Sequence, residues 1–305
     1  MPLDPQVQAV LEAAKKANVA ELWQLTPHDA RAEYLRRTTR LKVDVDIHRF
    51  EDREIDGPGG PIPIRIYTPR ELEEGEKLPV LVWYHGGGYV IGDLDTHDSV
   101  CRALANEADC IVVAVDYRLA PEHKFPSAVD DCEAALKWVA KHAKEINADG
   151  TRIAVGGDSA GGNLATVVSI LARDAGFPNI VFQLLIYPVT APEPETKSHH
   201  AFAEGYLLTR KTITWFFTHY LRSSKDTKDF RYAPLEADDL SSLPPALIIV
   251  EYAEAMIHAG NRVRLSNYEG MVHGFYLMGG MVDASRRAVS ESAAMLREAF
   301  APAGE

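Results

Sequence analysis

Five short runs of consecutive apolar residues place the tightest limit on how this chain can fold. Helical segments separate most of these runs, and none of them alternates with polar residues. The runs are 80–84, 111–115, 153–155, 182–186 and 246–250. Strands that are buried on both faces have this composition. The sequence therefore predicts an α/β fold, with a mostly parallel central sheet flanked by helices.

Two amphipathic helices and a hairpin are expected ahead of the sheet. Asp4-Pro5 and Thr26-Pro27 each place a capping residue before a proline, which is a helix-start pattern. The two helices form either a lid over a site or an N-terminal decoration. Alternating apolar residues across 43–66, around the turn 56–60, predict two antiparallel strands.

Composition excludes several kinds of partner. The net charge of −12 argues against nucleic acid and against an anionic membrane surface. No apolar run approaches the ~20 residues of a membrane helix, and residues 1–16 do not resemble a signal peptide. Cys101, Cys110 and Cys132 lack metal-type spacing, so we expect buried thiols, a cytoplasmic location and no metal.

A glycine-flanked serine stands at the end of the third buried strand. The segment 156–162 reads Gly-Gly-Asp-Ser-Ala-Gly-Gly, and an apolar helical pattern follows it. A serine with glycines two residues away on each side, between strand and helix, is typical of a nucleophile elbow. The alternative is a glycine-rich turn that binds phosphate. Ligands bind at the carboxyl ends of parallel strands, where Ser159 lies.

Three consecutive glycines follow the first buried strand. His85 precedes Gly86, Gly87 and Gly88, and such a run costs backbone entropy. We favour a loop whose amides face a developing oxyanion, where an added Cβ would block close approach. A flexible turn accounts for one glycine but leaves the run and the histidine unexplained.

A single histidine has the placement expected of a general base. His273 lies in a glycine-containing loop after the late strand 263–268, and it follows the serine in chain order. His142 and His219 fall on charged or amphipathic helices, and His199-His200 is expected to be an exposed pair.

Taken together, these motifs resemble the bacterial hormone-sensitive-lipase-like esterases of the α/β-hydrolase superfamily. The resemblance extends from about 79 to 275. It rests on four ordered stretches, His85–Gly88, Asp116–Glu122 with Phe125-Pro126, Gly157–Gly162 and His273–Phe275.

The resemblance implies a role for each residue of the site. Ser159 would be the nucleophile and His273 its base, and the amides of Gly87, Gly88 and Ala160 would form the oxyanion hole. His85, Gly86 and Asp158 would support these groups. No metal or organic cofactor is implied, and the ligand would be a small acyl ester. A homodimer is compatible with the resemblance.

The resemblance also implies one domain, 1–305, with a helical cap. The cap would consist of about 1–42 and an insertion at about 189–229. One helix of the insertion carries aromatic residues that suit either core packing or the wall of an acyl pocket, namely Trp215, Phe216, Phe217 and Tyr220. Arg118 and Glu122 are expected to tie down their loop rather than contact substrate, and Glu122 is a candidate brace for the oxyanion loop near His85.

The third member of the expected triad is missing from its place. The family carries an aspartate after the strand 246–250, within an Asp-Pro-Leu-Arg-Asp-like loop, whereas here Glu251-Tyr252 runs directly into a helical segment. Only residues 253–262 remain for a parallel crossover that needs roughly 10–12. We interpret this as an absent segment, rather than as a triad rebuilt around Glu251 or Glu254.

The resemblance implies hydrolysis of short- to medium-chain acyl esters through an acyl-enzyme on Ser159. Amidase or deacetylase activity is one alternative. A weakly active or binding-only protein is another, because the loss of a triad acid lowers kcat by about 10⁴ in serine proteases.

Overall fold

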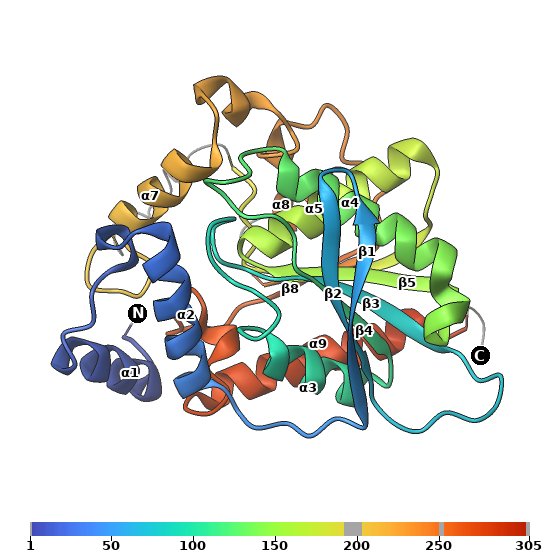
Figure 1. The fold of residues 1–305 in the computed structure, drawn as a ribbon, viewed down its shortest axis with the longest axis horizontal. Helices are drawn as coiled ribbons and strands as arrows, with labels where there is room; N and C mark the ends of the chain where they lie inside the picture. Colours follow the sequence, from blue (N-terminus) through green and yellow to red (C-terminus); the bar gives the residue numbers. More distant parts are fainter. Residues whose placement is uncertain (1, 192–202, 250–252, 303–305) are drawn as a thin grey trace.

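A single eight-stranded sheet organises the molecule (Figure 1). The computed structural model describes residues 2–191, 203–249 and 253–302. The strands run in the order β1-β2-β4-β3-β5-β6-β7-β8. Their bounds are β1 Arg49–Gly57, β2 Gly60–Thr68, β3 Leu78–Tyr84, β4 Ile111–Val115, β5 Ala148–Asp158, β6 Ile180–Ile186, β7 Ala246–Ile249 and β8 Val263–Ser266. All pairs from β4 to β8 are parallel, which confirms the predicted fold.

The predicted hairpin is present but begins later than expected. The first strand starts at Arg49, which pairs with Thr68 at the end of β2. The sequence prediction was therefore wrong for residues 43–48. β2 ends at Thr68 and is followed by Pro69, which has no amide hydrogen to continue the ladder opposite those residues. β2 also pairs with β4 in the antiparallel direction and so joins the hairpin to the parallel strands.

Helices cover both faces of the sheet. Those with at least six residues are α1 Pro5–Lys16, α2 Pro27–Leu41, α3 Asp98–Ala108, α4 Ser127–His142, α5 Ala160–Ala175, α7 Arg210–Tyr220, α8 Ala253–His258 and α9 Asp283–Phe300. Short 3₁₀ turns occupy Leu22–Gln24, Ala143–Ile146, Ser224–Lys228, Pro234–Glu236 and Phe275–Leu277. Asp4 and Thr26 cap α1 and α2 through their side chains, as the sequence predicts.

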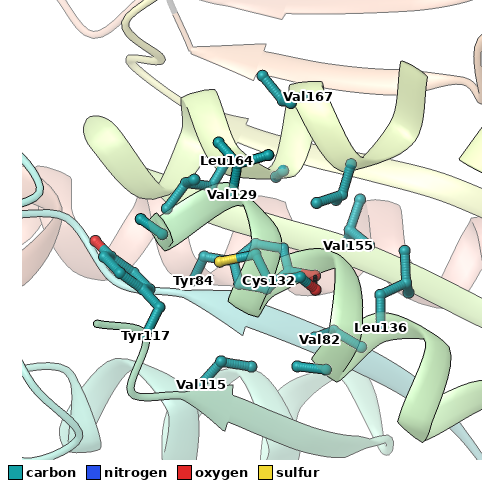
Figure 2. Packing of buried hydrophobic residues seen from close by; sticks show 14 of the residues in the cluster. Val82, Tyr84, Val115, Tyr117, Val129, Cys132, Leu136, Val155, Leu164 and Val167 are labelled. Atoms are coloured by element: carbon teal, nitrogen blue, oxygen red, sulfur yellow. Dashed lines mark hydrogen bonds between the residues drawn. The ribbon is translucent and has the colours of Figure 1, made fainter. Parts of the chain in front are cut away.

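The core is divided between the two faces of the sheet. On one face, side chains from β3, β4 and β5 pack against α4 and α5 (Figure 2), with Val82, Val155 and Leu164 fully buried. On the other face, Trp83 and Val112 pack in a second cluster with residues of α3 and α9. All three cysteines are free and buried, as expected. Burial on both faces explains the continuous apolar runs in the sequence.

Helices α1, α2 and α7 lie together at one end of the sheet (Figure 1). Thr209, the cap of α7, donates a hydrogen bond from Oγ1 to Oε2 of Glu21 at 2.8 Å. The Lys211 ammonium lies 5.0 Å from the Trp23 ring centroid. These contacts join α7 to the segment between α1 and α2. Residues 192–202 of the expected insertion, with His199-His200, lie outside the described residues.

Candidate active site

Ser159 occupies a strained turn between β5 and α5. Its backbone has φ +55° and ψ −117°, and its amide donates to the carbonyl oxygen of Ile186 at 2.8 Å. A Cβ on Gly157 would lie 2.4 Å from the carbonyl oxygen of Tyr84, and one on Gly161 would lie 1.9 Å from it. Glycine is therefore required on both sides, because the turn presses against the end of β3.

The histidine singled out in the sequence reaches this serine. His273 Nε2 lies 2.8 Å from Ser159 Oγ, although the two residues are 114 positions apart in the chain. The His273 ring packs against Tyr187, with 4.5 Å between ring centroids. This distance is within the range for proton transfer from a serine hydroxyl to an imidazole.

The loop that follows β3, residues 85–91, is called the glycine loop here, and it contains positive φ angles that few residue types tolerate. Gly87, Gly88 and Tyr89 have φ values of +125°, +59° and +63°. A Cβ on Gly87 would lie 2.1 Å from the carbonyl oxygen of Ile91, and one on Gly88 would lie 2.3 Å from the Phe216 ring. The loop is thus confined between its own backbone and an aromatic side chain of α7. The run of glycines follows from this confinement.

Three amides near Ser159 keep their hydrogen-bonding capacity. Ala160 is the first residue of α5, so its amide has no acceptor within the helix. In the chain as described, the amides of Gly87, Gly88 and Ala160 donate to no protein acceptor. Donors at a helix N-terminus and in a glycine loop are suited to an anionic oxygen.

A buried carboxylate connects the glycine loop to the turn that carries Ser159. Asp158 Oδ1 accepts a hydrogen bond from the Gly86 amide at 2.9 Å and lies 3.0 Å from His97 Nε2. Burial alone would raise the pKa of Asp158, but the His97 ring and the Gly86 amide outweigh burial and hold that pKa below its ordinary value. His97 was not predicted from the sequence. Its position shortly after the glycine loop was the one feature of the sequence that pointed to a role at the site.

His85 supports the loop as a neutral side chain. Its Nδ1 lies 2.8 Å from the Gly86 carbonyl oxygen, and its ring stacks on Tyr117 at 4.2 Å between centroids. Tyr117 Oη donates to the His85 carbonyl oxygen at 2.7 Å. Burial, with the adjacent His97 ring, lowers the pKa of His85 to about 4.

Arg118 and Glu122 hold their loop, as the sequence predicts, but with partners that it did not identify. Arg118 pairs with the buried Asp131 of α4 at 2.8 Å. Glu122 pairs with Arg31 of α2 at 2.6 Å. Arg31 also donates to the Val90 carbonyl oxygen at 2.9 Å, so Glu122 reaches the glycine loop through Arg31 rather than through His85.

The expected position of the triad acid lies outside the described residues. These residues exclude Glu251 and Tyr252, and the side chain of Glu254 is not described either. The adjoining strands β7 and β8 are parallel neighbours, and Ala246 is aligned with Val263. In the described part of the crossover between them, residues 253–262, the short helix α8 is the one regular element.

The fold and this site define a class of protein. The profile of a family described as having an alpha/beta hydrolase fold matches residues 81–277. The chain therefore belongs to the α/β-hydrolase family, in its hormone-sensitive-lipase-like branch. In the described residues, none of the helices is both long and apolar enough to cross a membrane. These residues also contain no cluster of three or more His, Cys, Asp or Glu side chains that could hold a metal ion.

Several proteins similar to this chain are ester hydrolases by name. The chain is 42% identical to the carboxylic ester hydrolase LipN of Mycobacterium tuberculosis, over 97% of this chain and 82% of LipN. It is 43% identical to the carboxylesterase NlhH of the same organism, over 83% of each chain. A hyperthermophilic esterase from Pyrobaculum calidifontis has a similar structure, with 40% identity, a TM-score of 0.93 and coverage of 98% of this chain and 99% of that one. These names favour ester hydrolysis over the amidase, deacetylase and binding-only alternatives.

The alignment with LipN is longer than the part of this chain that it includes. It spans 313 positions, more than the 305 residues of this chain, although only 97% of the chain takes part. LipN therefore has residues without a counterpart in this chain.

Proposed function

We propose that this protein hydrolyses carboxylic esters of short- to medium-chain acids through an acyl-enzyme on Ser159. The observation that carries the proposal is the 2.8 Å contact between Ser159 Oγ and His273 Nε2 in a strained strand-to-helix turn. Nucleophile and base within hydrogen-bond reach are the signature of covalent acyl transfer. The phosphate-turn alternative does not account for the histidine.

In the first half-reaction, His273 Nε2 accepts the hydroxyl proton while Ser159 Oγ bonds to the ester carbonyl carbon. The negative charge that develops on the carbonyl oxygen is stabilised by the amides of Gly87, Gly88 and Ala160. When the tetrahedral intermediate collapses, the carbon–oxygen bond to the alcohol breaks. The alcohol departs with the proton that His273 has held.

In the second half-reaction, water replaces the alcohol. His273 takes a proton from the water, whose oxygen attacks the acyl carbon and forms a second tetrahedral intermediate. Cleavage of the bond to Ser159 Oγ releases the carboxylic acid and returns the proton to the serine. No redox step or cofactor is needed for this balance.

Helices α1, α2 and α7 act in this proposal as a cap over the site. Phe216 of α7 is in contact with Gly88, so an ester bound at the glycine loop would meet an aromatic wall. Ester pockets are mostly apolar, with few polar groups. Aromatic confinement next to the oxyanion loop supports short or medium acyl chains.

The test is the hydrolysis of p-nitrophenyl butyrate by the wild-type protein and by Ser159→Ala. We expect the variant to lose nearly all turnover, because it lacks the nucleophile. Ser169→Ala is a matched control, since Ser169 is a buried serine of α5 that donates to the Ala165 carbonyl oxygen. Equal rates for wild type and Ser159→Ala would refute the proposal.

A cytoplasmic location is part of the proposal. Its support is that Cys101, Cys110 and Cys132 are all free and buried, which suits a reducing compartment. Fractionation of the source cells would test it. A homodimer is also proposed, and light scattering of the purified protein would show one or two chains per particle.

A further inference from the structure

Two polar side chains, one of them a carboxylate, are buried next to the reactive serine. His97 Nε2 and Asp158 Oδ1 lie 3.0 Å apart, and their side chains are only 1% and 3% exposed. Buried charges are costly unless they are paired and hydrogen-bonded. Neither residue has a place in the proton transfers between Ser159 and His273.

Contacts at both ring nitrogens hold His97 in place. Thr96 Oγ1 lies 2.9 Å from His97 Nδ1. His97 Nε2 faces the carboxylate of Asp158, which is an acceptor, so we place a proton on this nitrogen. The Gly86 amide lies 3.3 Å from the same Nε2 and 2.9 Å from Asp158 Oδ1. The ring, the carboxylate and the loop amide therefore meet at one point.

His97 is the ring that bonds this carboxylate among its described contacts. The His85 ring lies 5.6 Å from the His97 ring between centroids, and burial lowers the pKa of His85 to about 4 and leaves it neutral. Tyr34 of α2 lies 6.5 Å from the His97 ring, and burial raises its pKa above the ordinary range. Asp158 therefore relies on His97 and on the Gly86 amide for its hydrogen bonds.

Asp158 is placed to align both parts of the site. It directly precedes Ser159 in the chain, and its Oδ1 accepts from the amide of Gly86 at 2.9 Å. A Cβ on Gly86 would lie 2.3 Å from Asp158 Oδ2, so the carboxylate contacts the loop along its backbone. Gly86 in turn precedes the two glycines whose amides face the oxyanion.

We propose that His97 and Asp158 form a positioning pair for the oxyanion hole, an inference that rests on the proposed esterase function. Asp158 fixes the glycine loop to the turn that carries Ser159 through the Gly86 amide. His97 Nε2 bonds the same carboxylate and holds it in the orientation that the Gly86 amide requires. The pair acts through the loop and does not contact the substrate.

Two variants test the pair. Asp158→Asn and His97→Gln each retain a polar side chain but disturb the hydrogen bond between the two residues. We expect each to lower kcat for p-nitrophenyl butyrate about 10- to 100-fold, at or below the loss for a deleted oxyanion donor. KM should change by less than about threefold, because the oxyanion exists only in the transition state. The double variant should lose little more than the more affected single variant, because the two side chains act as one unit.

His142→Gln is the matched control. His142 lies at the end of α4 and bonds to the Trp138 carbonyl oxygen at 3.0 Å, outside the site, so its variant should keep the wild-type kcat. If Asp158→Asn and His97→Gln lower only thermal stability and leave kcat intact, the pair is purely structural and the proposal is wrong.

Nitrogen NMR of the wild-type protein keeps the proposal testable if the variants do not fold. We expect a proton on His97 Nε2, the nitrogen that faces Asp158, and its absence would overturn the pair. This readout does not depend on turnover. A wild-type protein without esterase activity but with a proton on His97 Nε2 would refute the proposed function while preserving the pair.

Discussion

Glycine is required at residue 161 because a methyl group there would lie 1.9 Å from the Tyr84 carbonyl oxygen. The same residue lies in the first turn of α5, where alanine would gain roughly 1 kcal/mol of helix propensity. The contact with backbone outweighs this gain, since neither the strand end nor the helix start can move without displacing Ser159. Packing, rather than helix propensity, therefore requires glycine at the positions around Ser159.

Gly161→Ala should therefore nearly abolish activity. We expect kcat to fall at least about 100-fold, as small misplacements of reacting groups cost this much. Gly162→Ala is the matched control, because its methyl group would lie 3.1 Å from its nearest neighbours and so requires a smaller shift. Steady-state kinetics of both variants provide the comparison, and equal rates would contradict the steric argument.

The environment of Asp116 leads us to predict a pH-dependent contribution to stability. Burial, with the nearby Asp93 and Asp95, raises the pKa of Asp116 to about 7. The folded state therefore holds a proton between about pH 4 and pH 7 that the unfolded state has released. Stability from this group is present at low pH and is lost as pH rises through that window.

Asp116→Asn should remove this loss. The melting temperature of the variant minus that of the wild type should grow as pH rises from 4 to 7 and then level off. Taking the difference cancels the opposite contribution of His85, which the variant retains. Thermal melts at half-unit pH intervals would test this, and a difference that does not depend on pH would contradict the raised pKa.

The side chain of Arg31 links helix α2 to the glycine loop. Arg31 donates to the carbonyl oxygens of Val90 and Ala120, both at 2.9 Å, and pairs with Glu122. Glu122 is about half exposed, and exposed ion pairs contribute little stability. The hydrogen bonds to the loop carbonyls should therefore matter more than the ion pair.

Two variants separate these contributions. Glu122→Gln should lower the free energy of unfolding by no more than about 1 kcal/mol. Arg31→Leu should lower it by about 2–3 kcal/mol, because two charge-assisted hydrogen bonds are lost. Urea unfolding of both variants measures this, and an equal loss would show that the ion pair dominates.

At the scale of the whole molecule, local patterns in the sequence predicted most of the fold. Apolar runs identified the parallel strands, and short motifs identified Ser159 and His273 although 114 residues separate them. The partners of Asp158, Arg118 and Glu122 were not predicted. Each partner comes from a different element, and no periodicity or motif encodes such contacts. The start of β1 was misjudged because strand length depends on the partner strand.

The central claim is that Ser159 is an acyl-transfer nucleophile. Incubation with diethyl p-nitrophenyl phosphate followed by peptide mass spectrometry tests it most directly. We predict that one diethylphosphoryl group attaches to the peptide that contains Ser159, and that Ser159→Ala remains unmodified. Labelling at another residue, or equal labelling of the variant, would contradict the account.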